Sequence, residues 1–401
     1  MTTVEEALAI VDRETAPLGP DRVPAAEAFG RVLAAAVCAD VDWPPFDTSA
    51  MDGYAVHLAD AAAPGAFAAE GKYAVAAGDP PPPPLVPGEA VRVMTGAPIP
   101  RGTEAVVPVE HAQRRDGRVF FREAPAPGAH LRRRGESVAA GTVLLEVGRR
   151  LTARDTAVAA LCGADPVHVF RRPRVSIAAT GNELVAASDR PGPGQLRDSN
   201  GPMLAALCRA RGVTPERLSR VRDDAAQLAS LFGGAAQDGL DILLTSGGVS
   251  AGDHDLVPEQ AARSGFAILF HRVAMRPGKP IAFGRRGNLL WFGLPGNPVS
   301  ASVGFHLFVR RALDRLEGAA PAGPERVTAI LSREATRGAR ETWRDAALAV
   351  VGGTNQVELL RTAGSHDIAA HARAHALARI PAGAGSLPAG SEVECLLLER
   401  G

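Results

Sequence analysis

The segment with the strongest chemical signature is 241–255, where a hydrophobic strand leads into a turn rich in serine and glycine. Glycines let a backbone approach an anion and direct N–H groups at phosphate oxygens, while serines add hydroxyl donors. The turn contains Ser246, Gly247, Gly248 and Ser250. Asp253 and Asp255 follow it, and two spaced carboxylates can hold a divalent cation against phosphates. We predict a phosphate-binding turn; an ordinary strand-to-helix turn with solvated caps is the alternative.

A second turn of this kind separates the hydrophobic residues 289–292 from a long predicted helix that ends at about Leu316. It contains Pro295, Gly296, Asn297 and Ser300. A helix start carries free N–H groups and positive partial charge, which suit an oxyanion. Between the two turns, prolines stiffen the backbone that carries Arg276 and Lys279. A preorganised pair of cations is typical of an oxyanion or polyphosphate site, although solvated surface is an equal alternative on this pattern alone.

Acidic residues follow several predicted strands. Glu183, Asp224 and Asp255 each come just after a strand, and the carboxyl ends of parallel strands meet at one edge of a sheet. We therefore expect these three acids to converge, although each taken singly is more often a helix cap. Upstream, Asp52 precedes a glycine and Thr95 lies in a turn of glycine and proline. The residues alone predict only tight loops there.

Composition excludes several classes of protein. The 401 residues include 44 basic and 44 acidic side chains, so the formal net charge of +0 provides no general field for nucleic acid. Apolar runs are too short to span a bilayer, and the beginning of the chain does not resemble a signal peptide, which predicts a cytoplasmic protein without a membrane partner. The four cysteines form no CxxC pair. HExxH and GxxxxGK[ST] motifs are also missing. Only two basic residues, Lys72 and Lys279, are lysines.

The order of patterns predicts a multidomain α/β plus β protein. The capping box of Thr3 and Glu6 opens an amphipathic helix, and a second short helix follows Pro24. Short β-branched runs broken by glycine and proline then predict a β-rich insertion. Strands alternating with helices from residue 174 predict a mostly parallel sheet covered on both faces. The predicted domains are a helical domain of 1–45 and 146–172, an inserted β domain of 46–145, an α/β domain of 173–318 and a β domain of 324–401.

Eight ordered motifs resemble those of the molybdopterin molybdenumtransferases, the family that includes MoeA of bacteria and the E domain of gephyrin. The resemblance covers essentially the whole chain. It implies a homodimer with a three-layer α/β molybdopterin-binding domain beside helical, inserted β and C-terminal β-barrel-like domains. The motifs lie at residues 47–56, 92–100, 133–136, 180–184, 198–200, 245–252, 276–280 and 293–300.

The resemblance implies an enzyme of molybdenum cofactor biosynthesis. Such an enzyme takes adenylylated molybdopterin and molybdate and, with Mg²⁺, produces molybdenum cofactor and AMP. By motif, Glu183 and Asp255 would hold Mg²⁺, and Asp224 would support the rim. The catalytic set would be Asp52, Thr95, Asp224 and Lys279, with Asp52 and Thr95 contributed by the other subunit. Substrate would contact Ser246, Gly247, Gly248, Ser250, Arg276, Pro295, Gly296, Asn297 and Ser300.

Three departures from the family pattern leave alternatives open. Ser137 stands where an aspartate is common, His130 replaces a frequent asparagine, and Arg276 replaces a frequent lysine. The alternatives are a tungstate-preferring transferase and a non-catalytic molybdopterin-binding or scaffold paralogue. A stand-alone adenylylating enzyme is disfavoured by the additional domains. The adenylylating enzyme and the recipient molybdoenzymes are further candidate partners.

Overall fold

The computed structural model describes residues 1–249 and 256–399. The chain divides into two compact units, each treated by itself below. Unit 1 comprises Met1–Ala35, Val147–Ala153 and Pro166–Gly401, and unit 2 comprises Ala36–Glu146 and Arg154–Asp165. The four domains predicted from the sequence are a finer division than these units, and their boundaries stay a prediction.

Unit 1 contains a six-stranded sheet in the order β16-β13-β17-β21-β20-β18. The first four strands run parallel, whereas the hairpin of β20 and β21 makes the last two pairings antiparallel. The sheet is therefore mostly parallel, as predicted, over the four strands β16, β13, β17 and β21. The sequence did not predict the two antiparallel pairings at its other end. The strands are β13 (Val175–Thr180), β16 (Arg217–Val221), β17 (Ile242–Ser246), β18 (Ala267–His271), β20 (Ala282–Arg286) and β21 (Leu289–Leu294). A short parallel pair, β14 (Leu184–Val185) and β15 (Leu196–Arg197), follows β13.

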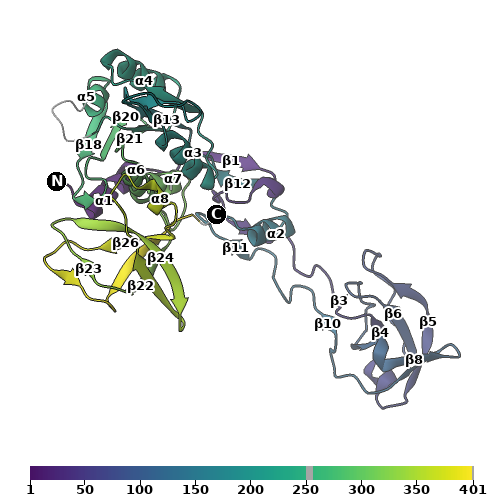
Figure 1. Ribbon diagram of the computed structural model, residues 1–401. Helices are drawn as coiled ribbons and strands as arrows, with labels where there is room; N and C mark the ends of the chain where they lie inside the picture. Colours follow the sequence, from purple (N-terminus) through teal and green to yellow (C-terminus); the bar gives the residue numbers. More distant parts are fainter. Residues whose placement is uncertain (250–255, 400–401) are drawn as a thin grey trace. The chain divides into compact units, whose positions relative to one another are not determined.

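Helices cover both faces of this sheet, which confirms the three-layer prediction (Figure 1). One face packs on α1, α3 and the helical stretch after β21, through residues such as Val11, Leu204 and Phe308. The other face packs on α4 and α5, where Phe232 meets Trp291 edge-on at 5.5 Å. The helices are α1 (Val4–Glu14), α3 (Asn200–Ala210), α4 (Ala225–Gln237), α5 (Leu256–Arg263), α6 (Pro298–Gly304) and α7 (Arg310–Leu316). Within the described part of the chain, no helix is both long enough and apolar enough to cross a membrane.

Local sequence explains where the first helix begins, but it misses an irregularity in a later one. The capping box of Thr3 and Glu6 is present at the start of α1, with both hydrogen bonds formed. The predicted long helix after Asn297 is interrupted by a π turn, η4 (Phe305–Val309), between α6 and α7. This turn is fully buried, so tertiary packing rather than a local signal sets it. The short helix expected after Pro24 is a single 3-10 turn, η1 (Ala25–Glu27).

The C-terminal part of unit 1 is a closed barrel, as the resemblance implied. The ring closes because β24 pairs with both β25 and β26, while β22 and β28 complete the circuit. One more strand, β19, joins the barrel from the α/β part by pairing in parallel with β24. The elements are β19 (Met275–Arg276), β22 (Arg326–Leu331), β23 (Ala335–Thr336), β24 (Glu341–Val351), β25 (Thr354–Leu359), α8 (Ile368–His371), β26 (Ala376–Ile380), β27 (Ser386–Leu387) and β28 (Glu392–Leu397).

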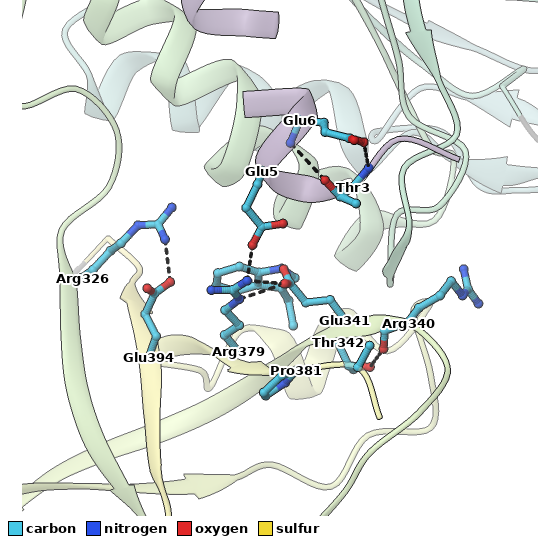
Figure 2. A network of polar contacts seen from close by, with 12 residues as sticks. Thr3, Glu5, Glu6, Arg326, Arg340, Glu341, Thr342, Arg379, Pro381 and Glu394 are labelled. Carbon is cyan, nitrogen blue, oxygen red and sulfur yellow. Dashed lines mark hydrogen bonds and ion pairs between the residues drawn. The ribbon is translucent and has the colours of Figure 1, made fainter. Parts of the chain in front are cut away.

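Ion pairs attach the first helix of unit 1 to this barrel. Arg379 on β26 lies between Glu5 of α1 and Glu341 of β24, donating two hydrogen bonds of 2.9 and 2.6 Å to Glu341 (Figure 2). The indole N–H of Trp343 donates to the second oxygen of Glu341 at 2.8 Å. Unit 1 also contains the antiparallel pair β1 (Pro20–Val23) and β12 (Val167–Phe170).

Unit 2 is built on its own six-stranded sheet, in the order β7-β4-β6-β5-β9-β8. Its small core contains Tyr54, Val107 and Phe121, which agrees with the β-rich composition predicted for this region. The sheet strands are β4 (Gly53–Val56), β5 (Phe67–Val75), β6 (Glu89–Val93), β7 (Ala105–Pro108), β8 (Ala112–Arg115) and β9 (Arg118–Phe121). The remaining elements are β2 (Val37–Cys38), β3 (Thr48–Ser49), η2 (Leu58–Ala61), η3 (Val109–His111), β10 (Leu131–Arg132), β11 (Val143–Leu145) and α2 (Ala153–Leu161).

The buried π turn places a histidine in the core of unit 1. His306 is 1% exposed, and burial, followed by the charges of Arg310 and His371, lowers its pKa to about 3. Glu399 lies 3.5 Å from its Nε2 atom, but the loss of solvation outweighs this attraction.

His306 should therefore make unit 1 sensitive to acid. In the unfolded chain histidine titrates near pH 6.5, so between about pH 6.5 and 3 the unfolded state binds the additional proton, and stability rises with pH across this window. We expect the melting temperature to fall from pH 7 to pH 5, and His306→Gln to flatten that slope. The exposed His366→Gln variant should keep the wild-type slope, and equal slopes in all three proteins would contradict the assignment.

Candidate functional site

The loops after β17 and β21 are tied together at the carboxyl edge of the parallel strands. The Ser246 hydroxyl donates to the Pro295 carbonyl at 3.1 Å and accepts from the Asn200 side chain at 2.7 Å. The same Asn200 amide also donates to the Gly296 carbonyl at 2.7 Å. Because Ser246 and Asn200 are both buried, these bonds fix the two predicted substrate turns against each other.

Gly247 and Gly248 owe their residue type to close packing. Gly247 has a φ of +104°, and a Cβ atom there would lie 2.2 Å from the Thr180 carbonyl oxygen. Its amide N–H donates to the Leu294 carbonyl at 3.0 Å, so the sequence-based expectation that it points at an anion is wrong for this group. At Gly248 a Cβ would meet the Val257 side chain at 2.4 Å. Ser250, Asp253 and Asp255 lie outside the described residues.

Two adjacent aspartates after β16 have different roles. Asp224 is the N-cap of α4, where its Oδ1 accepts from the amides of Ala226 at 3.1 Å and Gln227 at 2.9 Å. Asp223 instead lies near Glu183: burial, and then the charge of Glu183, raise the pKa of Asp223. Its Oδ1 atom is buried without a hydrogen-bond partner among the residues described. Sequence reasoning selected Asp224, although the position directly before a helix marks that residue as the cap.

A basic cavity of about 670 Å³ lies between the α/β part of unit 1 and its barrel. The pairing of β19 with β24 sets Met275 opposite Glu341 and Arg276 opposite Thr342, and Arg340 donates to the Met275 carbonyl at 3.0 Å. The predicted residues that line the cavity are Arg276, Lys279, Pro295, Asn297 and Ser300. The structure thus brings the two cations and the second turn to one cavity, as the sequence suggested.

The barrel contributes residues that the sequence did not reveal. Arg337, Arg340 and Arg344 also line the cavity. Arg337 donates to the carbonyls of Pro381 and Ala382, and Arg340 donates to the Met275 carbonyl. These two arginines therefore form part of the cavity wall with hydrogen bonds to the protein. The side chains of Arg276, Lys279 and Arg344, in contrast, have no acidic partner within 4 Å among the residues that can be described. No local motif marks Arg344, because its place in the cavity depends on a distant strand pairing.

The acid in the cavity wall is hydrogen-bonded to a histidine. Asp345 Oδ1 lies 2.7 Å from His371 Nδ1, and His371 Nε2 lies 2.8 Å from the Ser302 hydroxyl of α6. All three side chains are buried, and Ser302 is only 2% exposed, so this Ser-His-Asp arrangement is not an open nucleophilic site. It joins α6 to the barrel and withholds Asp345 from the free cations.

More hydrogen-bond donors at the start of α6 are already paired within the protein than the sequence predicted. Asn297 is the N-cap residue, but its amide donates to Ser365 Oγ at 2.9 Å rather than capping the helix. The Val299 N–H donates to the Ser365 carbonyl at 3.2 Å. One of the amide groups expected to be free for an oxyanion is therefore occupied, and Ser365 belongs to the cavity wall.

Asp52 and Thr95 form a local pair in unit 2. Asp52 Oδ1 accepts from the Thr95 amide at 2.7 Å and from the Thr95 hydroxyl at 2.8 Å. These two hydrogen bonds, with a smaller contribution from Arg92, lower the pKa of Asp52. The two predicted residues therefore act as one feature, an ionised carboxylate held at the ends of β4 and β6.

Comparison with known proteins identifies the family. A model described as the MoeA N-terminal region (domain I and II) matches residues 2–163, and a probable molybdopterin binding domain matches residues 176–315. Molybdopterin molybdenumtransferase 2 of Mycobacterium tuberculosis is 36% identical over 98% of this chain and 99% of its own length. The chain belongs to the MoeA family of molybdopterin molybdenumtransferases.

Other MoeA relatives agree in sequence and in fold. The molybdopterin molybdenumtransferase of a Nostoc species is 36% identical over 92% of this chain and 87% of its own. A solved molybdopterin biosynthesis MoeA protein from Pyrococcus horikoshii covers 99% of this chain at 27% identity, with a TM-score of 0.82. The family resemblance and the fold class predicted from the sequence are confirmed, and MoeA membership makes the chain an enzyme of molybdenum cofactor biosynthesis.

The role of Ser246 in joining the MoeA loops can be tested by removing its hydroxyl. We expect Ser246→Ala to destabilise unit 1 by about 1–2 kcal/mol, because the Pro295 carbonyl and Asn200 each lose a buried partner. Ser176→Ala is the matched control, since that buried hydroxyl has no hydrogen-bond partner among the residues described, and it should be neutral or slightly stabilising. The denaturant midpoints of the two variants measure their stability. Equal losses of stability would show that the hydrogen bonds of Ser246 do not stabilise unit 1.

Proposed function

We propose that this chain inserts molybdate into adenylylated molybdopterin and releases AMP in a Mg²⁺-dependent reaction. The observation that carries the proposal is the basic cavity, where Arg276, Lys279 and Arg344 face a common space without acidic partners in the described chain. Convergent cations on rigid elements stabilise an oxyanion and the negative charge of a phosphoanhydride under attack. Molybdate is here the oxyanion substrate, and the adjacent turns of Ser246 and Pro295 would hold the pterin phosphate.

The cysteine chemistry supports a reaction in which the substrate supplies the sulfur ligands. Cys162, Cys208 and Cys395 are buried, and burial raises the pKa of Cys208 to about 12 and that of Cys395 to about 11. These thiols stay protonated at neutral pH and are poor metal ligands. A dithiolene substrate needs no thiolate from the protein, so its two sulfurs would receive the molybdenum held by the cations.

The acids at the sheet edge fit a magnesium ion bound mainly through substrate. The buried, unpaired Oδ1 of Asp223 and the nearby Glu183 provide oxygen donors, the ligands that Mg²⁺ prefers. Among the residues described, no three His, Cys, Asp or Glu side chains form a cluster suited to a metal. Glu183 and Asp255 would hold the ion, with Asp223 near Glu183 and Asp224 supporting the rim as a cap. Bound there, Mg²⁺ would neutralise the pyrophosphate.

Asp52 and Thr95 belong to unit 2, whereas the cavity belongs to unit 1. We propose that they complete the site across a homodimer, so that the partner subunit supplies the ionised carboxylate. Exposed apolar side chains on unit 2 support the proposal that a partner subunit covers part of its surface. They include Val41, Trp43 and Phe46, which are 48%, 44% and 46% exposed. The cytoplasmic location and contacts with the adenylylating enzyme or recipient molybdoenzymes stay predictions.

The proposal is tested by AMP release from adenylylated molybdopterin with purified protein, Mg²⁺ and molybdate. We expect Lys279→Ala and Asp255→Ala to lower the rate about 100-fold or more, since each removes charge stabilisation in the transition state. Arg333→Ala is the matched control, because this exposed barrel arginine pairs with Glu358 outside the cavity. Tight substrate binding without AMP release would overturn the proposal and favour a non-catalytic paralogue. Parallel assays with tungstate measure the preference between the two oxyanions.

A further inference from the structure

Unit 2 carries its own basic cavity, separate from the one in unit 1. Its volume is about 480 Å³, which falls in the range of small-ligand sites. The charged residues of its lining are Glu70, Lys72, Arg92 and Arg114. The cavity shares no lining residue with the basic cavity of unit 1, and neither Asp52 nor Thr95 lines it.

The charges in this cavity do not balance. Arg114 Nε lies 2.6 Å from Glu70, so the one acid of the lining is already paired. Lys72 and Arg92 have no acidic partner within 4 Å in the described part of the chain. Two cations that share a concave surface repel each other, and a bound anion would reduce that repulsion.

Arg92 is held in position before any ligand arrives. Its guanidinium lies over the Tyr54 ring, 5.3 Å from the centroid, in the register where β4 and β6 pair Tyr54 with Arg92. Its Nη1 atom makes a long 3.5 Å contact to the Tyr54 hydroxyl, and its buried Nε has no hydrogen-bond partner among the residues described. A stacked arginine with unused donors loses little side-chain freedom on binding an oxyanion.

A break in the sheet aims Lys72 at the same space. The register between β5 and β6 shifts between Glu70 and Ala74, which leaves the intervening residues outside the ladder. Gly71 permits this close approach, because a Cβ atom there would meet the Val91 side chain at 2.9 Å. Bulges of this kind redirect side chains next to binding sites. Lys72 is one of only two lysines in the chain, and the other, Lys279, lines the basic cavity of unit 1.

We propose that the cavity of unit 2 binds a phosphate dianion, free or as part of a small phosphorylated molecule, between Lys72 and Arg92. Arg114 is the third donor and becomes available when the ligand competes with Glu70. A tetrahedral dianion fits three converging cations better than a single carboxylate does. The site is independent of molybdenum insertion, so it stands or falls separately from the proposed function.

The scarcity of lysine provides a direct test on the intact chain. Reductive methylation with ¹³C-formaldehyde keeps the positive charge and labels only Lys72, Lys279 and the terminal amine, so three NMR signals are expected. Lys72→Arg and Lys279→Arg assign them. On titration with inorganic phosphate, at ionic strength held constant with chloride, we expect the Lys72 signal to shift and saturate. A Lys72 signal that moves no more than in chloride alone would overturn the proposal.

Variants on unit 2 show whether the cavity itself causes the shift. Arg92→Gln should weaken phosphate binding at Lys72 about tenfold or more, as expected for loss of a charged hydrogen-bond donor. Arg118→Gln is the matched control, because Arg118 also stacks on a ring, that of Phe67 at 4.5 Å, but does not line the cavity. Equal binding by these two variants would contradict the proposal.

Glu70→Gln gives a second test, in which phosphate affinity is expected to increase rather than decrease. This variant releases Arg114 and removes the acid, so phosphate should bind Lys72 several-fold more tightly. Unchanged or weaker binding in a folded Glu70→Gln protein would also contradict the assigned site. The Lys279 signal reports on unit 1 in the same spectra and should be unaffected by every unit 2 variant.

Discussion

The parallel pairing of β19 with β24 is the constraint on which the candidate site depends. It takes the turn that follows Met275 out of the α/β layer and fastens it to the barrel, where Arg340 holds the Met275 carbonyl. Without this pairing, Lys279 and Arg344 would belong to separate surfaces. With this pairing, cationic side chains from the α/β part and from the barrel line one cavity, next to the loops that follow β17 and β21.

The same part of the molecule keeps its acids away from those cations. Asp345 is hydrogen-bonded to His371. Glu341 accepts from Arg379 (Figure 2). It also accepts from the Trp343 indole. Like charges gathered without counter-ions cost stability, and the buried bonds around them must hold that arrangement together. The result is a positively charged cavity in unit 1 whose charge is available to an anionic substrate. Stability and binding are thus arranged by the same contacts.

The sequence predicted the parts of the site that local patterns encode. Strand, turn and helix signals located Ser246, Asn297 and Lys279, and family motifs located the pair of Asp52 and Thr95. Local patterns could not reveal Arg344, because its neighbours arrive through a pairing between strands far apart in the chain. They also could not tell that the Gly247 amide donates to the Leu294 carbonyl, or that Asp223 lies near Glu183. In each case a tertiary contact decided which of several local options was taken.

We expect the oxyanion to bind in the basic cavity of unit 1. Anomalous diffraction from crystals grown with molybdate, recorded at the molybdenum edge, tests this most directly. The expected result is a single strong peak within contact distance of Lys279 and Arg344, absent from crystals of the Lys279→Ala variant. A strong peak elsewhere on the chain, with the cavity empty at saturating molybdate, would contradict the central claim.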